Sequence, residues 1–290
     1  MIVAIASGKG GTGKTTIATN MALTLEEAMP TQILDCDVEE PNAHLFLNPA
    51  VANIELVTLP VPVVDETRCD VCGRCSAVCA FHAILVMGGR VLAFPELCHG
   101  CGGCSLFCPT GAISEKPIDI GVVESGWAGG DGRINFVHGK LKVGRALAPP
   151  VIRAVKRKAH SKEAYAIIID APPGTSCPVV ASMVGSDFCL LVTEPTPFGL
   201  NDLVLAVEMV KALKIPFGVL INRSGLGDEE LKAYCEQNQI PILLEIPFDR
   251  RYAACYARGG RLVEEFPELK EALRGLWQKI EKKVGVESKL

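Results

Sequence analysis

Eight of the thirteen cysteines in this 290-residue chain lie in two runs that share one spacing. Each run follows C-x2-C-x2-C-x3-C, and both lie between residues 69 and 108. The cysteines are Cys69, Cys72, Cys75 and Cys79 in the first run, and Cys98, Cys101, Cys104 and Cys108 in the second. In a reducing compartment, thiols at such density indicate metal or redox chemistry and not disulfides.

The two runs, with Pro109 after the second, resemble the bacterial two-cluster ferredoxins. In that pattern the fourth cysteine of each run ligates the other cluster. The resemblance therefore implies two crossed ligand sets: Cys69, Cys72, Cys75 and Cys108 for one 4Fe–4S cluster, and Cys98, Cys101, Cys104 and Cys79 for the other. Structural zinc is the alternative, since paired C-x2-C also forms zinc sites, but the third cysteine and the x3 spacing favour clusters.

A glycine-rich segment near the N-terminus indicates phosphate chemistry. It reads Gly8-Lys9-Gly10-Gly11-Thr12-Gly13-Lys14-Thr15, followed by Thr16, and matches G-x4-G-K-[ST]. It lies between a predicted strand and a predicted helix, as a P-loop must. Backbone N–H groups and the helix N-terminus would cradle the phosphates of ATP. Lys14 would neutralise phosphate charge and Thr15 would ligate Mg²⁺. A chance glycine turn is the alternative.

The additional lysine, Lys9, makes this loop resemble the deviant Walker motif of the MinD/ParA/Mrp ATPases, which are related to the nitrogenase iron protein. In that family the first lysine reaches the partner's phosphates across a nucleotide-sandwich dimer. The resemblance implies an ATP-dependent homodimer in which Lys9 and Lys14 both act in hydrolysis. For Lys9 the alternative is an ordinary solvated lysine, since exposed lysines are common.

Two segments that contain aspartates extend the resemblance. Leu34-Asp35-Cys36-Asp37, followed by Pro41-Asn42, resembles the switch I segment, which implies that Asp37 orients or activates the attacking water. Ile167-Ile168-Ile169-Asp170, followed by Ala171-Pro172-Pro173-Gly174, resembles the Walker B strand and switch II, which implies that Asp170 holds Mg²⁺ through a water. Turn capping is the alternative for Asp35 and Asp37.

Two later segments resemble the adenine side of the family's site. Asn222-Arg223 follows a predicted strand, and Pro247-Phe248-Asp249 follows another. The resemblance implies adenine contacts from Asn222, Arg223, Pro247 and Asp249, although such residues are also ordinary turn formers. The cluster-carrier branch of the Mrp family often has a late C-x2-C, and this chain has none after the second cysteine run.

Composition narrows the possible partners. The formal net charge is −4, which does not favour a nucleic-acid surface. The N-terminus lacks the basic region and cleavage site of a signal peptide, and no run of 18 apolar residues is present. We therefore expect a cytoplasmic protein without membrane contact. An amphipathic helix at 267–284 carries lysines, as in membrane-binding helices, but core packing is the simpler prediction.

The hydrophobic pattern predicts an α/β fold with a parallel sheet and helices on both faces. We expect strands at 2–6, 32–35, 165–170, 188–193, 217–222 and 241–246, with helices at 14–28, 203–213 and 267–284. The pattern breaks near Pro60 and Pro62, and residues 121–144 suggest loops and short strands. Residues 1–61 and 117–290 would form the ATPase domain. Residues 62–116 would form an inserted α+β ferredoxin-like domain with short strands at 83–86 and 90–93.

Three functions are consistent with these motifs. In the first, ATP hydrolysis in a dimer is coupled to electron transfer through the clusters toward a redox partner or a metalloprotein that is being matured. In the second, the protein is a carrier or assembly factor for iron–sulfur clusters. The third is a MinD-like positioning or regulatory ATPase, which does not explain two complete cysteine runs.

Overall fold

The computed structural model describes residues 1–130, 132–159, 166–225, 227 and 229–285. In this part of the chain nine strands form one sheet, in the order β11-β10-β9-β1-β8-β2-β7-β6-β3. Neighbouring strands from β11 to β7 run parallel, while β6 and β3 are antiparallel to their neighbours. The predicted α/β class is confirmed, with a sheet that is mostly parallel.

The strands of the parallel part are short and buried, as parallel sheets covered on both faces require. They are β1 (Ile2–Ala6), β2 (Thr31–Asp35), β7 (Ile134–Leu141), β8 (Ala166–Asp170), β9 (Phe188–Thr193), β10 (Phe217–Ser224) and β11 (Ile242–Pro247). Six of the seven lie where the hydrophobic pattern predicts them. The first residue predicted for β8, at position 165, lies outside the described residues.

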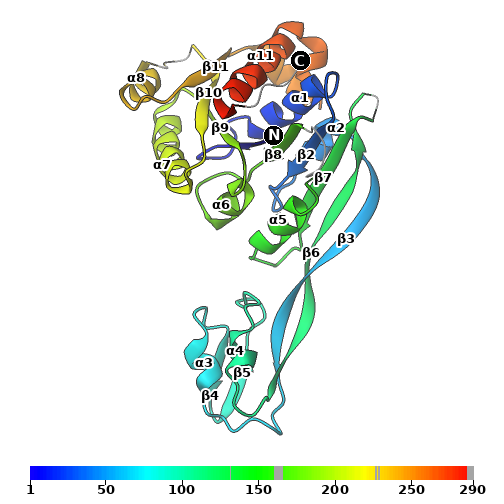
Figure 1. The fold of residues 1–290 in the computed structure, drawn as a ribbon, viewed down its shortest axis with the longest axis vertical. Coiled ribbons are helices and arrows are strands. Elements are labelled where there is room, and N and C mark those ends of the chain that lie inside the picture. Colours follow the sequence, from blue (N-terminus) through cyan, green and yellow to red (C-terminus); the bar gives the residue numbers. More distant parts are fainter. Residues whose placement is uncertain (131, 160–165, 226, 228, 286–290) are drawn as a thin grey trace.

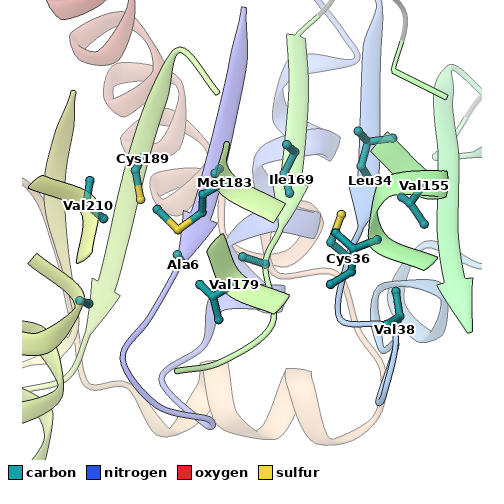
Figure 2. Close-up of a cluster of buried hydrophobic side chains, with 14 of the residues drawn as sticks. Ala6, Leu34, Cys36, Val38, Val155, Ile169, Val179, Met183, Cys189 and Val210 are labelled. Atoms are coloured by element: carbon teal, nitrogen blue, oxygen red, sulfur yellow. The ribbon is translucent and has the colours of Figure 1, made fainter. Parts of the chain in front are cut away.

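Helices cover both faces of the sheet. On one face α5 (Pro149–Lys156), α6 (Cys177–Met183), α7 (Pro197–Leu213) and α8 (Glu229–Gln237) pack on a core that includes Leu34 and Ile169. Figure 2 shows part of this core, with Val179 and Met183 of α6 against the strands and Cys189 on β9 among apolar side chains. Cys189 is fully buried and is therefore a core residue.

The opposite face is covered by the N-terminal and C-terminal helices. They are α1 (Lys14–Leu25), α2 (Ala43–Leu47), α9 (Arg250–Ala257), α10 (Leu262–Glu265) and α11 (Pro267–Val284). Leu273, Trp277 and Ile280 of α11 are fully buried in the core of this face. The C-terminal helix is therefore a core element, as predicted. Among the described residues no helix is both long and apolar enough to cross a membrane.

A two-stranded arm extends from the edge of the sheet (Figure 1). It is formed by β3 (Ala50–Val64) and β6 (Ile113–Ala128), which pair along their whole length. The expectation of loops and short strands over 121–144 is wrong, because β6 and β7 occupy most of it. The break expected near Pro60 and Pro62 is also wrong. Both prolines lie in β3, an edge strand, where a missing N–H is tolerated.

The cysteine runs lie in the segment at the far end of this arm (Figure 1). It contains α3 (Arg74–Val78), β4 (Ile84–Met87), β5 (Arg90–Ala93) and α4 (Gly103–Leu106). The two short strands predicted here are confirmed, and they form a hairpin of their own. We call residues 65–112 the cysteine module. The predicted boundaries after residues 61 and 116 fall within the β3–β6 ladder, and the division into two domains remains a prediction.

Candidate functional site

The glycine-rich loop joins β1 to α1 and adopts a conformation that its glycines permit. Gly11 and Gly13 have φ of 79° and 97°, in the left-handed region that other residues avoid. A Cβ on Gly13 would lie 2.5 Å from Nδ2 of Asn222. This amide nitrogen also donates to the Thr12 carbonyl oxygen at 2.9 Å. Asn222 therefore supports the loop, a role in addition to the adenine contact that the sequence suggests.

A cavity of about 420 Å³ opens beside this loop. Its volume is in the range typical of sites for small molecules and cofactors. Residues predicted for three separate parts of the site line it together: Gly10, Gly11, Gly13, Lys14, Thr15 and Thr16 of the loop, Asp37 of switch I, and Asn222, Arg223, Pro247 and Asp249 of the adenine side. The sequence did not single out Glu40, Tyr252 and Tyr256, which line it as well.

Three aspartates lie at the carboxyl ends of β2 and β8, where α/β proteins bind their ligands. Asp35 and Asp170 are opposite each other in the β2–β8 ladder, and both are almost fully buried. Asp35 accepts hydrogen bonds from the backbone N–H groups of Asp37 and Ala43, each at 3.1 Å. Asp35 therefore shapes the switch I turn, which is the capping role that the sequence left open.

Asp170 has a different environment. Neither of its carboxylate oxygens has a hydrogen-bond partner among the described residues, although both are buried. Burial raises its pKa, and the Lys14 ammonium opposes this rise. The Thr15 hydroxyl is near enough to act in the same direction as Lys14, but neither carboxylate oxygen accepts a well-formed hydrogen bond, so this buried position favours a ligand. The donor set of Asp170 and the Thr15 hydroxyl fits Mg²⁺, which prefers oxygen ligands and retains several waters.

Asp37 is half-buried and lines the cavity. Burial raises its pKa to about 6, and the nearby Lys14 ammonium limits the rise. The structure places Asp37 in the cavity lining near Lys14, and its contact with an attacking water stays a prediction.

Lys9 does not line the cavity. Its ammonium lies 2.5 Å from Oε1 of Glu194, which follows β9, and Oε2 of the same glutamate accepts from the Arg223 guanidinium at 2.9 Å. Gly8 also lies outside the cavity lining and packs on α7, where a Cβ would lie 2.1 Å from the Asp202 carbonyl oxygen. The sequence analysis missed Glu194, because a single glutamate after an apolar strand belongs to no motif.

In the cysteine module, one of the crossed ligand sets lines a single small cavity. Cys79, Cys98, Cys101 and Cys104 border it together, although Cys79 belongs to the first run and the other three to the second. Backbone N–H groups point at two of the sulfur atoms: Ala83 donates to Cys79 Sγ at 3.3 Å, and Gly100 donates to Cys98 Sγ at 3.4 Å. Such donors stabilise the charge of thiolates and of a bound cluster.

The other set repeats part of this geometry. The Ala112 N–H donates to Cys108 Sγ at 3.3 Å. The Ala83 N–H bonds Cys79 Sγ in the same way, and in both pairs the donor lies four residues after the cysteine. Gly73 and Gly102 precede α3 and α4 with φ of 79° and 73°. None of the thirteen cysteines is in a disulfide. In the part of the chain that the structure describes, no three His, Cys, Asp or Glu side chains are grouped to hold a single metal ion. A 4Fe–4S cluster does not need such a group, because each of its four cysteine ligands binds a different iron atom.

The comparisons with known proteins agree with the nucleotide site. Residues 3–263 match the sequence model of a protein family, the CobQ/CobB/MinD/ParA nucleotide binding domain. An uncharacterised protein of Methanocaldococcus jannaschii is 32% identical over 89% of this chain and 90% of its own length. A cytosolic Fe–S cluster assembly factor NUBP2 homolog of Culex quinquefasciatus is 23% identical over 99% of this chain and 97% of its own.

Among solved structures, the septum site-determining protein MinD of Pyrococcus horikoshii, complexed with Mg-ADP, resembles this chain. The TM-score is 0.61 with 20% sequence identity, and the match covers 100% of this chain and 99% of that protein. At this identity the likeness shows the fold alone. Together with the match of the family model to most of the chain, it leads to one assignment: the chain belongs to the CobQ/CobB/MinD/ParA family of P-loop nucleotide-binding proteins.

Proposed function

We propose that this protein is an ATPase that acts as a nucleotide-sandwich homodimer and couples ATP hydrolysis to electron transfer through two 4Fe–4S clusters in its cysteine module. The observation that carries the redox half is the cavity lined by Cys79, Cys98, Cys101 and Cys104. These four come from both runs in the combination that the ferredoxin pattern implies, so the cavity requires the two runs to fold against each other.

The residues of the nucleotide cavity support the ATPase half of the proposal. Lys14 is 7% exposed beside the cavity and would neutralise the phosphates, while Thr15 and Asp170 would hold Mg²⁺. The half-buried Asp37 would orient the water that attacks the terminal phosphate. Its raised pKa suits a group that takes part in proton transfer near neutral pH.

The cysteines would hold the clusters as two crossed sets, Cys69, Cys72, Cys75 and Cys108 in one and Cys98, Cys101, Cys104 and Cys79 in the other. Bound clusters would supply one-electron redox chemistry. The protein's own contribution is to direct N–H groups at Cys79, Cys98 and Cys108 and to pack apolar side chains such as Ile84 and Ile113 around the site.

The test combines both halves on the full chain with reconstituted iron and sulfide. ATP hydrolysis and the cluster midpoint potentials are measured with and without Mg-ADP and Mg-ATP. We expect hydrolysis, two clusters per chain and potentials that change with the nucleotide. Coupled electron transfer loses its basis when the midpoint potentials do not change with nucleotide and the rate of hydrolysis does not change with the redox state, because neither site then responds to the other.

A second candidate is a carrier or assembly factor for iron–sulfur clusters. It is favoured by the full-length likeness to a cytosolic Fe–S cluster assembly factor. The same loaded protein separates the two candidates when it is incubated with an apo-ferredoxin. Rapid ATP-dependent transfer of iron to the acceptor favours the carrier, whereas clusters retained through many rounds of hydrolysis favour electron transfer.

A further inference from the structure

A row of polar side chains crosses four neighbouring strands, from the nucleotide cavity to the arm. Asp170 on β8 is opposite Asp35 on β2, Asp35 is opposite His138 on β7, and His138 is opposite Glu124 on β6. Residues directly opposite in a ladder project from the same face of a sheet. The row therefore starts at the proposed Mg²⁺ ligand and ends on the strand that carries the cysteine module.

The contacts at the arm end of this row are close. His138 is 1% exposed, and its Nε2 lies 2.7 Å from Oε2 of Glu124. Lys140 donates to the same oxygen at 2.9 Å. Burial lowers the pKa of His138, and its hydrogen bond with Glu124 opposes this shift. Burial by itself would raise the pKa of Glu124, but the hydrogen bonds with His138 and Lys140 outweigh burial and lower this pKa. An ionised carboxylate thus holds two side chains of β7 against β6.

The switch I loop is attached to the same strand. The Leu141 N–H, at the end of β7, donates to the Val38 carbonyl oxygen at 2.7 Å, and Val38 follows Asp37 directly. A Cβ on Gly139 would lie 2.7 Å from Cγ1 of Val38, so the loop rests closely on β7. Beyond β7, the Lys142 N–H donates to the Ile120 carbonyl oxygen of β6 at 2.8 Å.

These contacts form one continuous connection. The Asp37–Val38 loop binds β7, β7 is joined to β6 by its ladder and by Glu124, and β6 runs with β3 into the cysteine module. In the sheet order, β7 is the strand through which the arm joins the parallel strands, although α5 also packs beside the arm. A displacement of the Asp37–Val38 loop therefore also displaces the arm, provided that β6 moves together with β7.

We propose that Glu124 is a positioning residue that couples the nucleotide cavity to the cysteine module, by making β6 follow the movements of β7 and switch I. The inference deepens the proposed function and rests on it, because it assigns the route between the two sites. It requires that the nucleotide alters the backbone of the arm, which can be measured whether or not the clusters change potential.

The test is hydrogen exchange of backbone amides in residues 113–128, with and without Mg-ADP, on the full chain loaded with iron and sulfide. The variant Glu124→Gln keeps the size of the side chain and removes its charge. Glu55→Gln is the matched control, because Glu55 is also an arm carboxylate, paired with the exposed Lys158 and outside the row. Coupling between sites corresponds to about 5- to 150-fold effects, so we expect nucleotide to slow exchange at least about fivefold in the wild type.

In Glu124→Gln this slowing falls below about twofold, while Glu55→Gln behaves as the wild type and both variants retain their affinity for Mg-ADP. A nucleotide effect that persists in Glu124→Gln overturns the inference, as does a wild type that binds Mg-ADP without any change in the arm. A wild type that binds neither nucleotide nor iron overturns the proposed function itself. If Glu124→Gln melts early, Lys140→Met removes the exposed donor to Glu124 Oε2 and is expected to reduce the slowing partially; an unreduced effect then counts against the inference.

Discussion

The nucleotide cavity and the cysteine module are built in opposite ways. The cavity joins residues that are far apart in sequence, as the hydrogen bond from Asn222 to Thr12 illustrates, and it lies against the large core of the sheet. The module is built from one segment, and its buried cluster is small: Cys75 and Ile84 of the module pack with Ile113 at the start of β6. The cavity thus depends on the whole fold, whereas the module depends on local spacing and on what its thiolates bind.

Removal of iron should produce the largest difference between the two regions. A segment with so few buried apolar residues gains much of its folding free energy from the group that it binds, as small metal-dependent domains do. We expect chelation to make residues 65–112 sensitive to proteolysis while Mg-ADP affinity stays within about twofold. Limited proteolysis with mass spectrometry measures the first effect, and calorimetry the second. Loss of nucleotide binding on chelation would show that the two regions fold together.

The next largest effect is expected on the nucleotide side. Lys14→Ala removes the buried ammonium beside Asp37 and Asp170, and loss of such a charge-stabilising group lowers the hydrolysis rate by about 10²- to 10³-fold. The absorption and electron paramagnetic resonance spectra of the clusters should not change. The measurement is phosphate release from reconstituted protein. If the spectra were lost as well, the variant would report misfolding and not a catalytic role.

The crossed ligand sets give a sharper test within the module. Cys79→Ala should remove the cluster that uses Cys98, Cys101 and Cys104, although Cys79 belongs to the first run, and should lower the iron content by about half. Cys79→Ser is the milder companion variant. Double variants distinguish the pairings: adding Cys98→Ala should cost no further iron, whereas adding Cys69→Ala should remove the rest. The opposite result would mean that each run binds its own cluster.

The smallest effect concerns Glu194. Its ion pairs with Lys9 and Arg223 are partly exposed, so Glu194→Gln should change the free energy of unfolding by less than about 1 kcal/mol. We expect a larger effect on association, because the change would release Lys9 for its proposed contact with a partner's phosphates. Light scattering with a non-hydrolysable ATP analogue should detect more dimer in Glu194→Gln and less in Lys9→Ala. If both variants and the wild type associate equally, Lys9 does not contribute to the dimer interface.

The sequence predicts most of the parallel sheet and the phosphate-loop residues that line the cavity, because buried strands and phosphate loops have strong local patterns. It does not predict Glu40, Tyr252 and Tyr256, which line the cavity from other segments. It misses the arm, because Pro60, Pro62 and the glycines of β6 suggest turns. The prolines are tolerated since β3 is an edge strand. Gly126 reflects close strand packing, since a Cβ there would lie 2.0 Å from the Ala50 carbonyl oxygen.

The connections between the two regions were equally hidden in the sequence. Glu124 and His138 belong to no motif, and they pair with each other only because the fold brings them near. Such pairs depend on strand register, and register over β6 and β7 cannot be assigned when the strands themselves are not recognised.

The length of the arm has a mechanical consequence. Between the β7 ladder, which begins at Gly121, and the cysteine module, β6 is supported only by β3 within the sheet, from Ile113 to Ile120. At roughly 3.3 Å per residue this part is about 26 Å long. It therefore acts as a lever, in which a rotation of about 10° at the root displaces the tip by about 5 Å. The same rotation therefore moves the cysteine module much further than it moves the strands beside the nucleotide cavity.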